Sequence, residues 1–126
     1  FNDIHAMLAF VGARDWPHAQ RLEDRLVQSA AQTTRHGQTT RLLGLDACRA
    51  LMAYGRGEHG SVVRLLSRLP ASAHRLGGSH AQRDVIQLTR QRSVERIVGL
   101  RQRRPAARSI LAQPWSGVGI GAPMAP

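Results

Sequence analysis

The sequence contains no lysine, a single cysteine and few aromatic residues. All 18 basic residues are arginine, against 8 acidic residues, and aromatic side chains make up 4% of the chain. One cysteine excludes an internal disulfide framework and a zinc site built from several cysteines. Lysine is a common phosphate ligand, so a surface selected for phosphate binding would be expected to contain some. The complete absence of lysine is better explained by the codon bias of a GC-rich genome.

Long apolar runs are also missing. No run approaches the ~20 residues that a membrane-spanning helix requires, and the opening residues Phe1–Asp3 have neither the basic nor the apolar region of a signal peptide. We therefore expect a cytoplasmic protein without membrane association. We also expect Phe1 to lie inside a longer natural chain, because it is not a translation start.

The sequence repeats itself with an offset of 43 residues. Leu8–Gly12 aligns with Leu51–Gly55, and Asp15 aligns with Glu58. The shared positions are a glycine, an acidic residue and apolar residues at helical spacing. This pattern is typical of a structural repeat.

Each repeat unit is predicted to consist of two helices. An apolar stripe at i, i+3, i+4 and i+7, starting at Ile4, predicts the first helix. Gly12 is predicted to end it with a left-handed turn, and Pro17 to lie in the first turn of the next helix. The units span about residues 2–32 and 40–70. Because no segment alternates with period two, the predicted class is all-α, with stacked antiparallel helix pairs.

A third unit is predicted to begin at Ser79 and to remain incomplete. Ser79 opens an S-x-x-Q pattern typical of a capping box. With an offset of 38 from the second unit, Thr89 takes the place of Leu51, and Ser93 that of Gly55. We therefore expect the apolar seam of the repeat to end near Thr89.

Units of this kind, with glycine before an acidic residue between the helices, resemble tetratricopeptide repeats. The closer resemblance is to the family of tetratricopeptide repeat protein 38, carried by Asn2–Met7, Ala50–Gly57 and Ala73–Asp84. It covers about residues 2–88. The resemblance implies a tetratricopeptide-like α-solenoid fragment from the carboxy-terminal part of a longer chain, and it brings no established catalytic residues.

Residues 90–126 differ in composition from the repeat region at 1–89. They hold seven arginines and one acid, a net charge of +6, whereas residues 1–89 have a net charge of +4. The last residues, 114–126, hold three prolines and three glycines and are predicted to be an irregular tail. The coincident loss of register and resemblance suggests a reading-frame shift after codon 88. Translation of the other two frames tests this hypothesis, which ends if neither frame yields an apolar helix pair.

Candidate ligand-binding residues lie on the first helix of each unit, which lines the concave groove of a solenoid. They are His5, Asp46, Arg49, His80, Arg83, Asp84 and Gln87. Asp46 and Asp84 recur with Asp3 near the helix starts, where they either compensate the helix dipole or form a row of carboxylates for a basic or amide-rich peptide. His80 and Asp84, one turn apart, form either an acid–base pair or a first turn with favourable charge.

No catalytic, cofactor or metal site is predicted. The six histidines form no H-x-x-x-H or H-E-x-x-H pair, and Cys48 is expected to be a small buried hydrophobe. The predicted function is therefore a non-enzymatic scaffold. Its partner is a protein or peptide, the remainder of its own longer chain, or a second copy bound to an exposed repeat end. The alternative is a basic nucleic-acid-binding module acting through residues 90–108, without specific recognition because no aromatic residue interleaves there.

Overall fold

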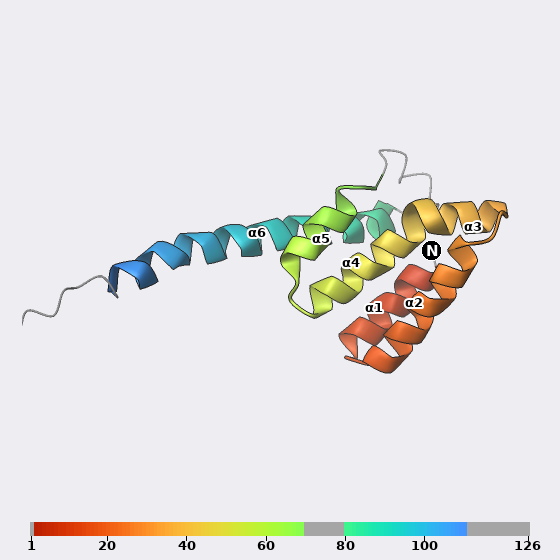
Figure 1. Ribbon diagram of the computed structural model, residues 1–126, viewed down its shortest axis with the longest axis horizontal. Helices are drawn as coiled ribbons and strands as arrows, with labels where there is room; N and C mark the ends of the chain where they lie inside the picture. The colour runs from red at the N-terminus through yellow and green to blue at the C-terminus, as the bar shows by residue number, and fades with distance from the viewer. Residues whose placement is uncertain (1, 70–79, 111–126) are drawn as a thin grey trace, which may run out of the picture.

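The computed structural model is helical throughout the part of the chain that it describes, residues 2–69 and 80–110, with the side chains of 80–83 and 103–110 excluded. The elements are α1 (Asn2–Gly12), α2 (Trp16–Ala30), α3 (Arg35–Thr39), the π-helical η1 (Thr40–Gly44), α4 (Leu45–Gly55), α5 (His59–Leu66) and α6 (His80–Ile110) (Figure 1). No strand occurs among these residues, so the predicted all-α class is confirmed. The predicted capping serine, Ser79, and the tail at 114–126 lie outside the described residues.

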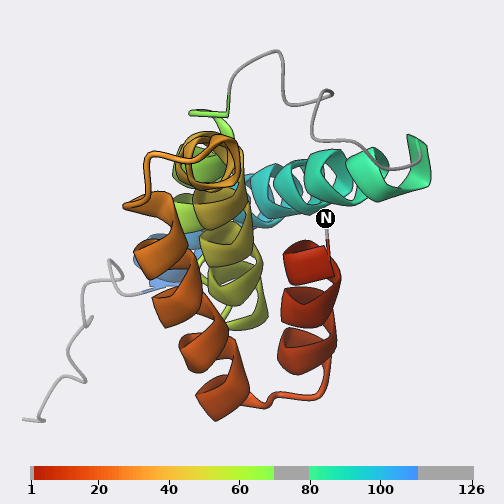
Figure 2. The same ribbon diagram turned by 90° about the vertical axis from the view of Figure 1, so that its right-hand side faces the viewer.

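Helices α1 and α2 form an antiparallel pair, as Figure 2 shows. The pair forms where the local signals place it: α1 ends at Gly12, and α2 starts at Trp16 with Pro17 in its first turn. The side chain of Asp15 accepts a hydrogen bond from the backbone N–H of His18 at 3.2 Å, which caps α2. The facing apolar stripes of the two helices are buried against each other.

The turn between α1 and α2 corrects the prediction for Gly12. The left-handed residue is Arg14, with φ of 56°, and not the glycine that ends the helix. The chain makes two further turn bonds after Gly12, from Ala13 to Ala9 and from Arg14 to Val11, and reverses direction only then. The backbone reversal therefore falls two residues later than a glycine signal alone indicates.

The turn between α4 and α5 has the same hydrogen bonds as the turn between α1 and α2. In the first turn, the N–H of Asp15 donates to the carbonyl of Phe10 at 2.8 Å; in the second, the N–H of Glu58 donates to the carbonyl of Ala53 at 2.8 Å. The flanking turn bonds recur at the same positions. The left-handed residue recurs as Gly57, with φ of 76°. Sequence positions 43 residues apart thus have the same local backbone structure.

Helix α4 lies at the centre of the core. One apolar cluster joins α4 to α1 and α2, and it comprises Ile4, Met7, Ala19, Leu22, Leu26, Ala47, Cys48, Leu51 and Met52. A second cluster joins the other side of α4 to α5, and it comprises Ala50, Ala53, Val62 and Leu66. Ile86 of α6 packs against both clusters. Helix α4 therefore contributes residues to both clusters, and the partly buried Ile86 of α6 links them.

Helix α6 runs through residue 90 without a break and packs against α5 and α4. Thr89 and Ser93 are both buried, so the buried face of α6 includes two polar residues at this point. The hydroxyl of Thr89 donates to the carbonyl of Val85 at 2.7 Å, and the Ser93 hydroxyl lies 3.3 Å from Nδ1 of His59. Because both hydroxyls have a partner, these polar residues can be buried without a large desolvation cost. The second half of α6 extends beyond the other helices (Figure 1).

Helix α4 is preceded by a helical segment, α3 and η1, that the sequence pattern did not predict. Thr34 caps α3 by accepting a hydrogen bond from the N–H of Gly37 at 3.1 Å. Gly37 is buried, and a Cβ there would clash with the carbonyl oxygen of Gln32. Elements α3, η1 and α4 follow one another without interruption from Arg35 to Gly55, so the helical part of the second unit starts before residue 40.

Candidate binding grooves

The first groove, here called the α2–α5 groove, lies over α4 between α2 and α5 and has a volume of about 210 Å³. Its lining residues are Glu23 of α2, Arg49, Met52 and Ala53 of α4, Arg56 and Glu58 of the turn, and Ser61, Arg64 and Leu65 of α5. Nε of Arg49 donates to Oε1 of Glu23 at 2.6 Å. This ion pair joins α2 to α4 along one side of the groove. The Glu23 side chain is 17% exposed and the Arg49 side chain 40% exposed.

The remaining arginines of the α2–α5 groove are held by neutral neighbours. The guanidinium of Arg56 lies 5.3 Å from the centroid of the Trp16 ring, a cation–π distance. Arg64 donates to the hydroxyl of Ser61 at 3.2 Å. Both guanidinium groups keep donors available to solvent, since both side chains are exposed. The groove can therefore donate hydrogen bonds to carboxylates or amide carbonyls of a bound chain.

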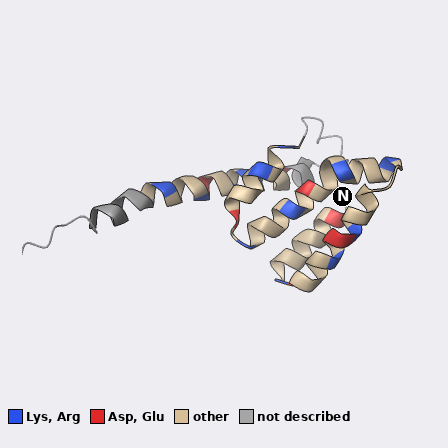
Figure 3. Ribbon diagram, in the orientation of Figure 1, with Lys and Arg blue, Asp and Glu red and all other residues tan. Residues whose placement is uncertain are grey.

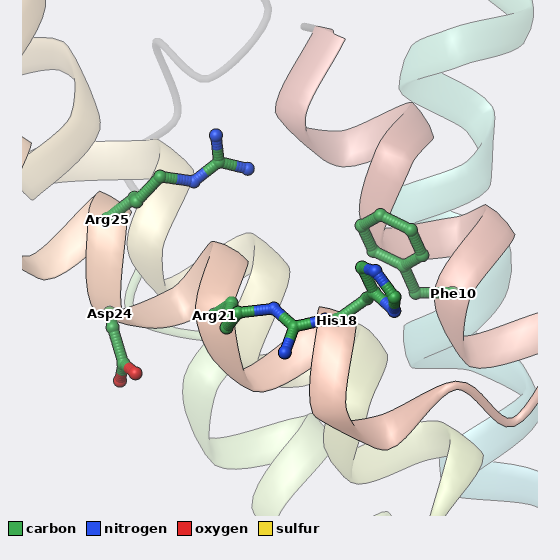
Figure 4. Close-up of a pocket in the computed structure, with 5 residues that line it drawn as sticks. All are labelled: Phe10, His18, Arg21, Asp24 and Arg25. Atoms are coloured by element: carbon green, nitrogen blue, oxygen red, sulfur yellow. The ribbon is translucent and has the colours of Figure 1, made fainter.

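The second groove, here called the α1–α2 groove, lies between α1 and α2 and has a volume of about 420 Å³. Figure 4 shows the five residues that line it: Phe10, His18, Arg21, Asp24 and Arg25. The rings of Phe10 and His18 are stacked, with centroids 5.4 Å apart and an interplanar angle of 27°. This stack forms an aromatic wall opposite the arginine side chains of α2 (Figure 4).

A contact with Asp15 holds His18 at the edge of the α1–α2 groove. Nδ1 of His18 lies 2.7 Å from Oδ2 of Asp15. The hydrogen bond from the His18 side chain, followed by that from the His18 backbone, lowers the pKa of Asp15 below its ordinary value of 3.8. The carboxylate that caps α2 therefore also orients the ring that forms the aromatic wall.

The two grooves occupy equivalent positions in the two helix pairs. At the offset of 43, Phe10, His18 and Arg21 correspond to Ala53, Ser61 and Arg64. The grooves differ in whether a helix of a preceding pair forms one of their walls. In the α2–α5 groove, α2 of the preceding pair packs on α4 and presents Glu23. Within residues 2–69 and 80–110, no helix takes that place beside the α1–α2 groove.

The predicted binding residues are distributed over three helices and do not line one groove. Of those whose side chains the structure describes, only Arg49 lines either groove. His5 is exposed on α1, Asp46 is half-buried in the first turn of α4, and Asp84 and Gln87 are exposed on α6. His80 and Arg83 also belong to α6, but their side chains lie outside the described residues, as does the proposed pair of His80 with Asp84.

Four of the lining residues were not among those predicted from the sequence: Phe10, Glu23, Arg21 and Arg25. Both grooves use side chains of the first and second helix of a pair, whereas the candidate residues were chosen on first helices alone. A signal for Arg21 was present, because the offset of 43 residues aligns it with a second arginine, Arg64. No comparable signal existed for Glu23, whose partner is separated from it by many residues in sequence.

Among the described residues, no three His, Cys, Asp or Glu side chains are grouped so that they could hold a metal ion. No described helix combines the length and the apolar character that crossing a bilayer requires. No protein-family model matches the sequence, and no solved structure matches the chain. The function is therefore argued from the geometry of the grooves and of the helix pairs.

Proposed function

We propose that the chain is a non-catalytic protein-interaction scaffold built from stacked, tetratricopeptide-like helix pairs. The proposal includes the resemblance of residues 2–88 to the family of tetratricopeptide repeat protein 38, and a cytoplasmic location. It is supported first by the turn that recurs with the same hydrogen bonds in both helix pairs. Repeated local structure of this kind is what a tandem array of helix pairs requires.

The observation that carries the proposal is a contact between pairs that recurs. Gly55, at the end of α4, lies against Val11 and Trp16 of the first pair. Ser93 takes the place of Gly55 in α6, and His59 takes the place of Trp16 at the start of α5. These two equivalent residues are again in contact, through the bond between Ser93 and His59. A small residue, glycine in one contact and serine in the other, lies against an equivalent helix start in both places, which supports the stacking of successive units.

The α2–α5 groove is the proposed site for a partner peptide. It lies at the junction of two helix pairs, where the guanidinium groups of Arg56 and Arg64 are exposed beside the apolar Met52 and Leu65. Arginine is enriched in protein interfaces because its planar fork binds carboxylates and carbonyls in a defined geometry. We propose that the partner presents acidic or amide side chains to this groove.

Site-specific crosslinking tests the scaffold proposal. A photoreactive amino acid replaces Ser61 inside the α2–α5 groove, and in a matched variant it replaces Arg35, which is exposed on α3. We expect one discrete protein to be crosslinked through position 61, and Arg56→Glu combined with Arg64→Glu to abolish that product. Equal products from both positions, or none from position 61, would contradict the proposed site.

Nucleic-acid binding through residues 90–108 is the second candidate function. The observation that favours it is a run of exposed arginines along α6 that continues into the part of the helix extending from the bundle (Figure 3). These residues are Arg90, Arg92, Arg96 and Arg101. Contacts with phosphates weaken steeply with salt because counterions are released on binding. Retention on a polyanion at physiological salt, lost when these four arginines become glutamine, would favour this candidate over the scaffold.

A further inference from the structure

The α1–α2 groove combines an aromatic wall with two arginines that form no hydrogen bond or ion pair in the described part of the chain, although the charge of Arg21 helps to lower the pKa of Asp15. Arg21 and Arg25 line the groove, both are exposed, and neither forms a hydrogen bond or an ion pair with a described residue. The acid of the groove, Asp24, accepts a hydrogen bond from Gln20 at 3.2 Å. In Figure 4 the two guanidinium groups extend toward the space beside Phe10, whereas the carboxylate of Asp24 points away from it.

In the second helix pair, a helix of the preceding pair forms one wall of the equivalent groove. There, α2 packs on α4, and its Glu23 carboxylate binds Arg49 at 2.6 Å. An amphipathic helix that presents a carboxylate to an arginine is thus the occupant of this position within the molecule itself. In the α1–α2 groove, Ala6 takes the place of Arg49. The cations that remain for an incoming carboxylate are Arg21 and Arg25, on the α2 side.

Charge argues against a second copy of the chain as the occupant. The chain has a net charge of +10, so two copies repel each other, whereas an acidic partner is attracted. The stacked rings of Phe10 and His18 supply the apolar contact that a purely electrostatic site would lack. The groove therefore suits a ligand with an apolar face flanked by carboxylates.

We propose that the α1–α2 groove binds an acidic amphipathic helix of a partner protein, with an apolar side chain against Phe10 and carboxylates on Arg21 and Arg25. This inference deepens the proposed scaffold function and rests on it. It adds a second docking position, on the outer side of the first helix pair, to the position in the α2–α5 groove. Docking here repeats the α2-on-α4 packing that the chain uses internally.

The test uses a synthetic helical peptide of roughly 18 residues, about five turns, with leucine on one face and glutamate beside it. A second peptide has glutamine in place of every glutamate. Binding to the full chain is measured by fluorescence anisotropy, and the site is mapped by backbone amide chemical shifts. We expect the acidic peptide to change the amide chemical shifts of Phe10, His18 and Arg21. The glutamine peptide should bind at least about tenfold more weakly than the acidic peptide.

Matched charge variants separate the groove from general charge attraction. The variant R21E/R25E should weaken binding of the acidic peptide by about tenfold or more, whereas R35E/R68E, which changes the same charge at exposed sites outside both grooves, should change it less than about threefold. R21Q/R25Q provides a milder change if the reversal disturbs α2. Circular dichroism verifies that all variants keep their helix content.

Several results would overturn the inference. One is an equal loss of acidic-peptide binding in R21E/R25E and R35E/R68E. Another is equal affinity for the acidic peptide and the glutamine peptide, and a third is the absence of amide chemical-shift changes at the groove residues. Self-association of the chain that R21E/R25E removes would assign the groove to a second copy, and tighter binding of a single-stranded oligonucleotide at the same arginines would assign it to nucleic acid. If this test fails while crosslinking through position 61 succeeds, the scaffold proposal stands and only the second docking position is lost.

Discussion

At the scale of single residues, the two inter-helix turns show one backbone requirement met by two different amino acids. The left-handed position is Arg14 in the first turn and Gly57 in the second. A residue with a Cβ at this position is strained by about 1–2 kcal/mol. The first turn therefore tolerates a strain that the second turn avoids, and the hydrogen bonds of the turn hold both in the same conformation.

Replacement of Gly57 by alanine should destabilise the protein by about 1 kcal/mol or more, because its φ of 76° is unfavourable for any residue with a Cβ. Gly60 provides the control: it is helical, and a Cβ there meets nothing within 4 Å. Gly60→Ala should raise stability by about 0.5–1 kcal/mol. Urea unfolding measures both changes, and a loss of equal size in the two variants would contradict the assignment of the left-handed residue.

The carboxyl group of Asp15 should titrate below its ordinary pKa of 3.8, since it accepts hydrogen bonds from the side chain and the backbone of His18. A pKa lowered in the folded state stabilises the fold above the unfolded pKa, and this stabilisation is lost as pH falls through the folded pKa. The stability difference between the wild type and Asp15→Asn should therefore shrink on acidification from about pH 6 to about pH 2.5. Carbon-13 NMR of the carboxyl group gives the pKa directly. A value at or above 3.8, or one unchanged by His18→Ala, would show that the pair does not stabilise the carboxylate.

At the scale of helices, close packing between pairs depends on the small residue at the end of α4. A Cβ on Gly55 would clash with the Val11 side chain and lie 3.0 Å from the Trp16 ring, whereas a Cβ on Gly12 meets nothing within 4 Å. Gly55→Ala should therefore cost about 1–3 kcal/mol from overpacking, despite the better helix propensity of alanine. The equivalent Gly12→Ala should be neutral or stabilising by up to about 1 kcal/mol. If thermal unfolding ranks the two variants in the opposite order, α4 does not meet the first pair as described.

The helix ends that were predictable depend on short-range signals. Pro17 in a first turn and Asp15 at a cap act within one turn of the chain, and α2 starts where they indicate. The apolar stripe from Ile4 likewise defines a buried helix face that can be read from spacing alone. Such features need no knowledge of what packs against them.

The features that were not predictable depend on partners far away in sequence. Thr89 and Ser93 read as polar interruptions of an apolar seam, yet both are buried, because one hydroxyl bonds to its own helix and the other to His59 on α5. The α2–α5 groove was missed for the same reason, since it depends on the pairing of Arg49 with Glu23. Burial of a polar residue becomes predictable only when its hydrogen-bond partner is known.

At the scale of the whole molecule, the two apolar clusters are linked through α4 and α6. The cluster around α1, α2 and α4 and the cluster around α4 and α5 meet at Ile86 of α6. Since α4 contributes to both clusters, we expect the first and second helix pairs to unfold together.

Cys48 offers a measurement of this cooperativity. Its thiol is fully buried within the cluster that joins α4 to α1 and α2, and burial raises its pKa to about 12. Because the thiolate is the reactive form, we expect no reaction with a disulfide reagent near pH 8 in the native state. In urea, labelling should follow the same transition as helix loss. A Cys48→Ala protein with Ser67→Cys, at an exposed position, provides the rate of an accessible thiol. Labelling of Cys48 at that rate in native buffer, or well before helix loss in urea, would show that α4 separates from the first pair on its own.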